Sequence, residues 1–112
     1  MYVVVEAWTP CPEFLGLPVV AREELFTAVR EGIAKLADAG IECLGWGRLD
    51  QVFRGLAHEW LAVWTMPSAE HADIMLSAVT ASGWYDWFDQ TNLRAELTST
   101  DEAIAEHIKL AG

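Results

Sequence analysis

The sequence predicts a single α+β domain in which an antiparallel sheet carries two helices on one face. Three observations support this class: four segments rich in β-branched and aromatic residues, two helical patterns between them, and a length of 112 residues. The hydrophobic content of 53% is enough for a real core and argues against disorder. We therefore expect one domain over residues 1–112.

The first half of the chain predicts a strand, a helix and a second strand. Residues 2–8 are rich in valine, and Pro10 ends this strand because proline cannot donate to a sheet ladder. Residues 21–39 repeat apolar side chains with helical spacing, and Gly40 suits the left-handed position after a helix. Residues 41–49 form the second predicted strand.

The second half predicts a strand, a helix, a strand and a short C-terminal helix. Residues 58–65 form the third strand, and the serine that opens residues 68–82 is a good N-cap for the second helix. Residues 91–98 form the least apolar strand, and residues 99–102 have the Ser-x-x-Glu spacing of a capping box. The β-α-β-β-α-β order is that of a ferredoxin-like domain.

One face of this sheet gathers tryptophans and charged side chains. Strand residues alternate between faces, and we assign Val3, Val5 and Ala7 to the face that the helices cover. The opposite face then carries Glu6, Trp8, Trp46, Arg48, His58, Trp60, Trp64, Arg94 and Glu96. So many tryptophans mark an interaction surface, and the charges are too costly for a dry core. The pattern favours a concave small-molecule pocket, and a plain dimer interface is the alternative.

The polar residues of this set suggest proton transfer. Histidine is the side chain suited to exchanging protons near neutral pH, so His58 is a candidate, and Glu6 could orient it or act as the base. Residues 84–90 could close the mouth of the pocket. The structural alternatives are a hydrogen-bonded strand-end histidine, ion pairs for the arginines, and core packing for residues 84–90. The catalytic candidates are His58, Glu6 and Asp86, and the substrate-binding candidates are Trp8, Trp46, Arg48, Trp60, Trp64 and Tyr85.

Charge and motifs exclude several classes of function. The net charge of −10, from 7 basic and 17 acidic residues, disfavours nucleic acid and anionic membrane surfaces as partners. We expect no signal peptide or membrane span, and we expect Cys11 and Cys43 to be free thiols in a reducing cytoplasm. No metal-ligand spacing or nucleotide-binding motif is present, so we expect no metal, haem or flavin cofactor.

The chain resembles the dimeric α/β-barrel superfamily in three respects: the order of its elements, its aromatic sheet face and the stretch EWLAVWTMPS at residues 59–68. In that superfamily, a strand that ends in tryptophan often leads into the second helix. The segments WTPCPEFLGLP and SGWYDWFDQTN look more like a group of small bacterial proteins of unassigned function. The resemblance implies a homodimer in which two sheets form a barrel. The pocket would lie between each sheet and its own helices, or near the barrel mouth.

The superfamily includes cofactor-free monooxygenases, isomerases and cyclases. Its haem-degrading members place a histidine near the end of the second helix, where this chain has Trp84, Tyr85 and Asp86, and this departure argues against haem. We expect a small cofactor-independent enzyme that abstracts a proton from an aromatic or polycyclic metabolite, leading to oxygenation, isomerisation or cyclisation. A non-catalytic dimeric small-molecule-binding protein and a purely structural dimer are the alternatives.

Overall fold

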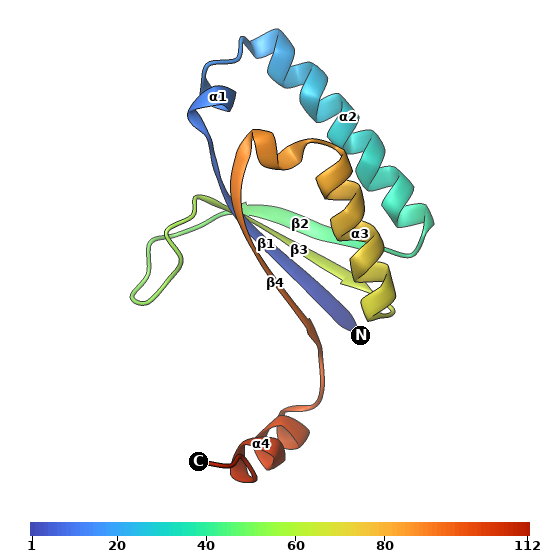
Figure 1. The fold of residues 1–112 in the computed structure, drawn as a ribbon, viewed down its shortest axis with the longest axis vertical. Coiled ribbons are helices and arrows are strands. Elements are labelled where there is room, and N and C mark those ends of the chain that lie inside the picture. Colours follow the sequence, from blue (N-terminus) through green and yellow to red (C-terminus); the bar gives the residue numbers. More distant parts are fainter.

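The computed structural model describes all residues from Met1 to Gly112 and contains one four-stranded antiparallel sheet of order β2-β3-β1-β4 (Figure 1). The strands are β1 (Tyr2–Pro10), β2 (Glu42–Arg48), β3 (Trp60–Met66) and β4 (Phe88–Glu96). The helices are α1 (Pro12–Leu15), α2 (Val19–Asp38), α3 (Ala69–Ala81), the 3-10 helix η1 (Trp84–Asp86) and α4 (Thr100–Ile108).

Capping residues and a glycine turn set several of the helix boundaries. Ser68 accepts a hydrogen bond from the backbone N–H of His71 at the start of α3, and Ser99 accepts one from Glu102 at the start of α4. After α3, Gly83 adopts a left-handed backbone with φ of 81°, a conformation that costs glycine little. This turn directs the chain into η1 and then β4.

Helices α2 and α3 lie on the same face of the sheet, whereas α4 and the β2–β3 loop project away from it (Figure 1). The core lies between this face and the helices, and α3 contributes the buried Ala72 and Met75. None of the side chains of α2 is fully buried. The half-buried apolar stripe of α2 consists of Leu25, Phe26, Val29, Ile33 and Leu36. Helix α2 therefore covers the sheet without closing tightly on it.

The fold class predicted from the sequence needs correction. The prediction was a ferredoxin-like sheet with two helices and a short C-terminal helix, closed into a dimeric α/β barrel. The structure instead has four α-helices and an open sheet of order β2-β3-β1-β4. The short helix α1 was missed because Pro12 was interpreted only as a strand breaker, although proline also suits the first position of a helix.

The predicted assignment of the two sheet faces was reversed. Residues paired across antiparallel strands share a face, and Glu6 pairs with Ala62 and Asn92. The grouping of tryptophans with Glu6 therefore stands, but Glu6 and Trp64 are buried on the side that α2 and α3 cover. The other side carries Val3, Val5, Leu61, Val63 and Leu93. Both sets are apolar, so alternation alone could not say which one the helices cover.

Candidate ligand-binding site

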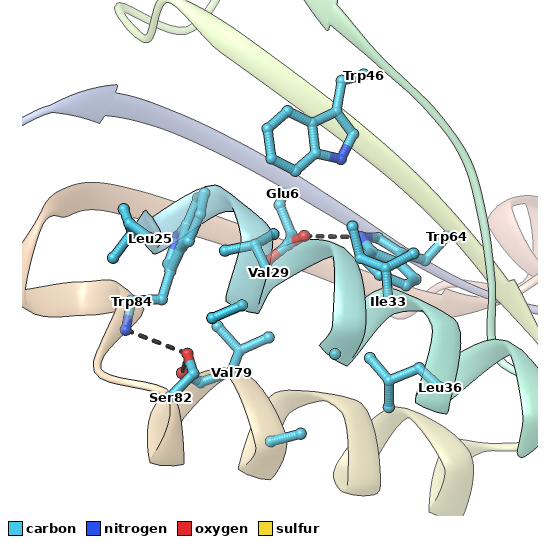
Figure 2. Close-up of a pocket in the computed structure, with 13 residues that line it drawn as sticks. Glu6, Leu25, Val29, Ile33, Leu36, Trp46, Trp64, Val79, Ser82 and Trp84 are labelled. Carbon is cyan, nitrogen blue, oxygen red and sulfur yellow. Dashed lines mark hydrogen bonds between the residues drawn. The ribbon is translucent and has the colours of Figure 1, made fainter. Parts of the chain in front are cut away.

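A cavity of about 160 Å³ lies between the sheet and helices α2 and α3 (Figure 2). Ten of its 13 lining residues are hydrophobic, so the wall is largely apolar. The lining residues are Leu25, Ala28, Val29, Gly32, Ile33 and Leu36 of α2, Glu6, Trp46 and Trp64 of the sheet, and Ala78, Val79, Ser82 and Trp84 near the end of α3. An apolar cavity of about 150 Å³ accommodates one benzene ring, so this space suits a ligand of about one ring.

A bulge in β2 brings Trp46 into the cavity. The register between β2 and β3 shifts between Cys43 and Gly45, where the backbone of Gly45 has φ of 157°. Cys43 and Trp46 then share a face, although regular alternation would place them on opposite sides. Trp46 extends over the sheet toward the cavity, and Figure 2 shows its ring above Glu6.

Glu6 is the one charged residue among those that line the cavity. Glu6 is only 6% exposed, and both carboxylate oxygens accept hydrogen bonds from the protein. Trp64 Nε1 donates to Oε1 at 2.7 Å, and Gln90 Nε2 donates to Oε2 at 2.7 Å. A carboxylate has about four acceptor positions, so further positions remain for a ligand.

The orientation of the Gln90 amide is fixed by its other neighbours. Trp84 Nε1 donates to Gln90 Oε1 at 2.6 Å, and an indole nitrogen can only donate. The amide nitrogen of Gln90 must therefore point away from Trp84, toward Glu6 and the Oδ1 atom of Asn92. The network presents donors to Glu6 from two sides, an arrangement that supports an ionised carboxylate.

Burial and hydrogen bonding change the pKa of Glu6 in opposite directions. Burial raises the pKa of Glu6 above its ordinary value of 4.5, and hydrogen bonds from Gln90 and Trp64 offset part of that rise. No cation offsets the rest: the salt bridge of the molecule joins Arg94 to Asp73 and involves no cavity residue. Glu6 is therefore a buried carboxyl with an increased affinity for protons.

Small residues on α2 and at the end of α3 lie on the solvent-exposed side of the cavity. Ala28, Ala78 and Ser82 line the cavity and are nevertheless exposed to solvent. Gly32 also lines the cavity from the middle of α2, and a Cβ atom built on it meets no atom within 4 Å apart from its chain neighbours and the backbone of its own helix. The cavity is therefore open to solvent between the two helices, and we expect a ligand to enter there.

Replacing Gly32 by phenylalanine should close this opening. We expect the affinity for a one-ring probe, benzyl alcohol, to fall by about 10-fold or more, because the new ring would occupy space that the probe needs. Gly32→Ala is the matched control: it should keep binding and stabilise the helix by about 0.5–1 kcal/mol. Titration followed by NMR and thermal unfolding measure the two effects. Unchanged binding in Gly32→Phe would show that ligands do not enter between α2 and α3.

The structure places three of the sequence-predicted site residues, Glu6, Trp46 and Trp64, at the cavity. Trp8 lies behind them: it is 3% exposed, and its ring centroid is 4.9 Å from that of Trp46. Trp8 therefore supports the aromatic wall without forming part of the cavity surface. Its contact with Trp84, at 5.5 Å, extends the same aromatic cluster.

The remaining predicted residues lie outside the cavity. His58 precedes β3 and bridges two hydroxyls, Thr9 Oγ1 at 3.1 Å and Thr91 Oγ1 at 3.0 Å. Arg48 stacks over the ring of Trp60 at 5.5 Å. Within η1, Tyr85 accepts a hydrogen bond from Asn92, and Asp86 is exposed. None of His58, Arg48, Trp60, Tyr85 and Asp86 lines the cavity.

Gln90 and Trp84 are site residues whose roles the sequence reasoning missed. Both fall within residues 84–90, which the sequence indicated as a cover for the pocket or as core packing. Trp84 is 8% exposed and stacks on Phe88 at 3.9 Å while its indole nitrogen reaches Gln90. The sequence held one signal for this: Phe88 and Gln90 are two residues apart, so in a strand they share a face. That spacing would have placed the start of β4 before Thr91.

The metal-binding and thiol side chains of the molecule form no cluster. No group of three or more His, Cys, Asp or Glu side chains is arranged to hold a metal ion. Cys11 and Cys43 are unpaired thiols, and burial raises the pKa of Cys43 above its ordinary value of 9.0. No helix has both the length and the apolar character needed to cross a membrane.

Comparison with known proteins defines the family and the fold. No curated protein matches this chain. The crystal structure of the Arabidopsis thaliana protein At3g17210, determined with ensemble refinement, is similar with a TM-score of 0.60 and 17% sequence identity, over 89% of this chain and 98% of that one. At this identity the similarity concerns the fold alone. A family of unknown function, DUF6616, matches residues 1–110. The chain therefore belongs to the DUF6616 family.

Proposed function

We propose that this protein is a small cofactor-independent enzyme that binds a single-ring aromatic metabolite and removes a proton from it with Glu6. One observation carries the proposal: a buried carboxylate without a neighbouring cation lines a tryptophan-rich cavity. Perturbed carboxyl groups in apolar pockets are typical of catalytic bases. The cavity volume of about 160 Å³ favours one ring over a polycyclic compound.

The proposed chemistry begins with one proton transfer. A free oxygen lone pair of Glu6 takes the proton, and the C–H electron pair stays on the substrate carbon as a resonance-stabilised carbanion. Isomerisation follows if Glu6 returns the proton at another carbon, and cyclisation follows if the carbanion attacks a carbonyl of the same molecule. Oxygenation requires dioxygen as a second substrate. Trp46, Trp64 and Trp84 hold the ring by edge-to-face packing.

Hydrogen exchange tests the proposal without knowledge of the natural reaction. The protein is incubated in D₂O with one-ring ketones such as phenylacetone, whose benzylic protons are acidic, and deuterium incorporation is followed by NMR. We expect exchange faster than in buffer alone. Binding of these compounds without faster exchange would favour the alternative function, a non-catalytic small-molecule-binding protein that uses the same cavity.

We also propose that the protein associates with a second copy of itself through the sheet face that carries no helix. The central strands present Val3, Val5, Leu61 and Val63 on this face, and Leu93 beside them is 55% exposed. Helix α4 projects from the same sheet with further exposed apolar side chains, Ile104 at 51% and Ile108 at 79%. A continuous group of exposed apolar side chains is typical of an interface between proteins.

Sedimentation at micromolar concentration should show a homodimer for the wild-type protein. Leu93→Arg should shift the equilibrium toward the monomer, because it places a charge in the apolar contact. Leu15→Arg is the control, since Leu15 is similarly exposed at 59% and belongs to α1 rather than to the sheet. A wild-type protein that sediments as a monomer would contradict the proposal.

A further inference from the structure

We propose that the ligand of this cavity is a small organic cation, either a protonated amine or a quaternary ammonium group, whose positive charge lies against Glu6. The inference rests on the proposed function because it uses the same cavity, and it adds the charge of the ligand. It follows from the charges, the free acceptor positions and the aromatic rings around Glu6.

The cavity has a negative charge and no positive one. Glu6 is the single charged lining residue, and the two arginines of the sheet contact other residues. Arg48 stacks on Trp60, and Arg94 pairs with Asp73 at 2.8 Å. A buried carboxylate without a counter-ion costs several kcal/mol of lost hydration. A cationic ligand supplies the missing partner, whereas an anionic ligand adds repulsion in a medium of low dielectric constant.

The hydrogen-bond network leaves Glu6 able to bind such a ligand. Each carboxylate oxygen accepts one protein hydrogen bond, from Trp64 on Oε1 and from Gln90 on Oε2. Each oxygen therefore retains one further acceptor position. Because Trp84 fixes the orientation of the Gln90 amide, the donor on Oε2 stays in place. One oxygen can pair with an ammonium group while the other remains available for proton transfer.

Aromatic rings surround this carboxylate. Trp46 and Trp84 lie with their ring centroids 6.0 Å apart and their planes at 74°, and Trp64 lines the cavity with them. The faces of tryptophan rings attract organic cations, and groups of such rings recognise alkylammonium ligands. The net charge of −10 also raises the concentration of cations near the protein. Aromatic character and charge therefore favour the same class of ligand.

Three probes of nearly equal size and different charge test the inference: benzylammonium, benzyl alcohol and benzoate. Their affinities are measured at neutral pH by calorimetry and by the shifts of the tryptophan indole N–H signals in NMR. We expect benzylammonium to bind about 10-fold or more tightly than benzyl alcohol, and benzoate to show no measurable binding. Glu6→Gln should abolish the preference for the cation. Glu24→Gln, an exposed change on α2 with the same effect on net charge, should keep it.

The outcomes separate this inference from the proposed function. Equal binding of benzylammonium and benzyl alcohol would overturn the cation preference and leave the pocket intact. A preference that survives in a folded Glu6→Gln variant would show that the overall charge, rather than Glu6, selects the ligand, and would also overturn the inference. Failure of all three probes to bind would remove the cavity as a ligand site, together with the proposed function. The ranking in the wild-type protein decides the first question even if Glu6→Gln does not fold.

Discussion

Replacing Trp64 by alanine should lower the free energy of unfolding by about 3–5 kcal/mol, as large aromatic truncations in a core do. Trp64 is 3% exposed and belongs to the hydrophobic core. The change also removes the N–H group that donates to Glu6 at 2.7 Å. Because the free energy of unfolding of a domain is only about 5–15 kcal/mol, this single substitution removes a large part of the stability. Urea denaturation measures the loss.

Trp64→Phe separates the two contributions of the side chain. It keeps an aromatic ring in the core but removes the donor, so the loss should approach the penalty of about 1–3 kcal/mol for a buried polar group without its partner. The pKa of Glu6 should rise further, because one of the two hydrogen bonds that lower it is gone. Trp87→Ala is the control for losing a tryptophan without losing a donor to Glu6, because Trp87 is half-buried at the edge of the core and makes no hydrogen bond to Glu6. It should leave the pKa of Glu6 unchanged. An equal loss in the phenylalanine and alanine variants would show that ring volume contributes little.

Local signals in the sequence predicted most elements of the fold. The valine-rich run predicted β1, and the serines at positions 68 and 99 predicted the starts of α3 and α4, because capping chemistry acts within a few residues. The side of the sheet that the helices cover depends on contacts between distant segments. In β1, both Val3 and Val4 are apolar, so periodicity left the two faces equivalent.

Some residues of the site could also be predicted from the sequence, but their contacts could not. Alternation along the strands placed Glu6 and Trp64 on the same sheet face, and in the structure Trp64 donates a hydrogen bond to Glu6. The position of Trp46 depends on a bulge beside Gly45, which a period of two cannot represent. Gln90 became a partner of Glu6 because β4 begins at Phe88, three residues before the predicted start at Thr91. Side chains separated by more than eighty residues meet there, and no local pattern encodes their contact.

Glu6→Gln should slow deuterium exchange into phenylacetone by about 100-fold or more while benzyl alcohol still binds. The loss follows from the proposed role, because an amide cannot accept the substrate proton as a general base does. A glutamine at position 6 would also face two donors, Trp64 and Gln90. Its single oxygen can accept from one of them, and its amide nitrogen, which only donates, would then face the other. Thermal unfolding must therefore accompany the kinetics, and Glu6→Asp serves as a second variant that keeps the charge but withdraws the carboxylate from its donors.

The pH dependence of this exchange distinguishes Glu6 from a base elsewhere in the molecule. A general base works in its deprotonated form, so the rate should rise with pH as Glu6 loses its proton. Because burial raises the pKa of Glu6, the rise should be centred above 4.5, and Trp64→Phe should move it to higher pH. Cys43 is a second titrating group near the cavity, but its pKa is raised from 9.0, so it stays protonated over this range. If exchange persists in a folded Glu6→Gln variant with the same pH profile, Glu6 is not the base. A profile that instead disappears with His58→Gln would place proton transfer at the Thr9 and Thr91 end of the sheet, outside the cavity.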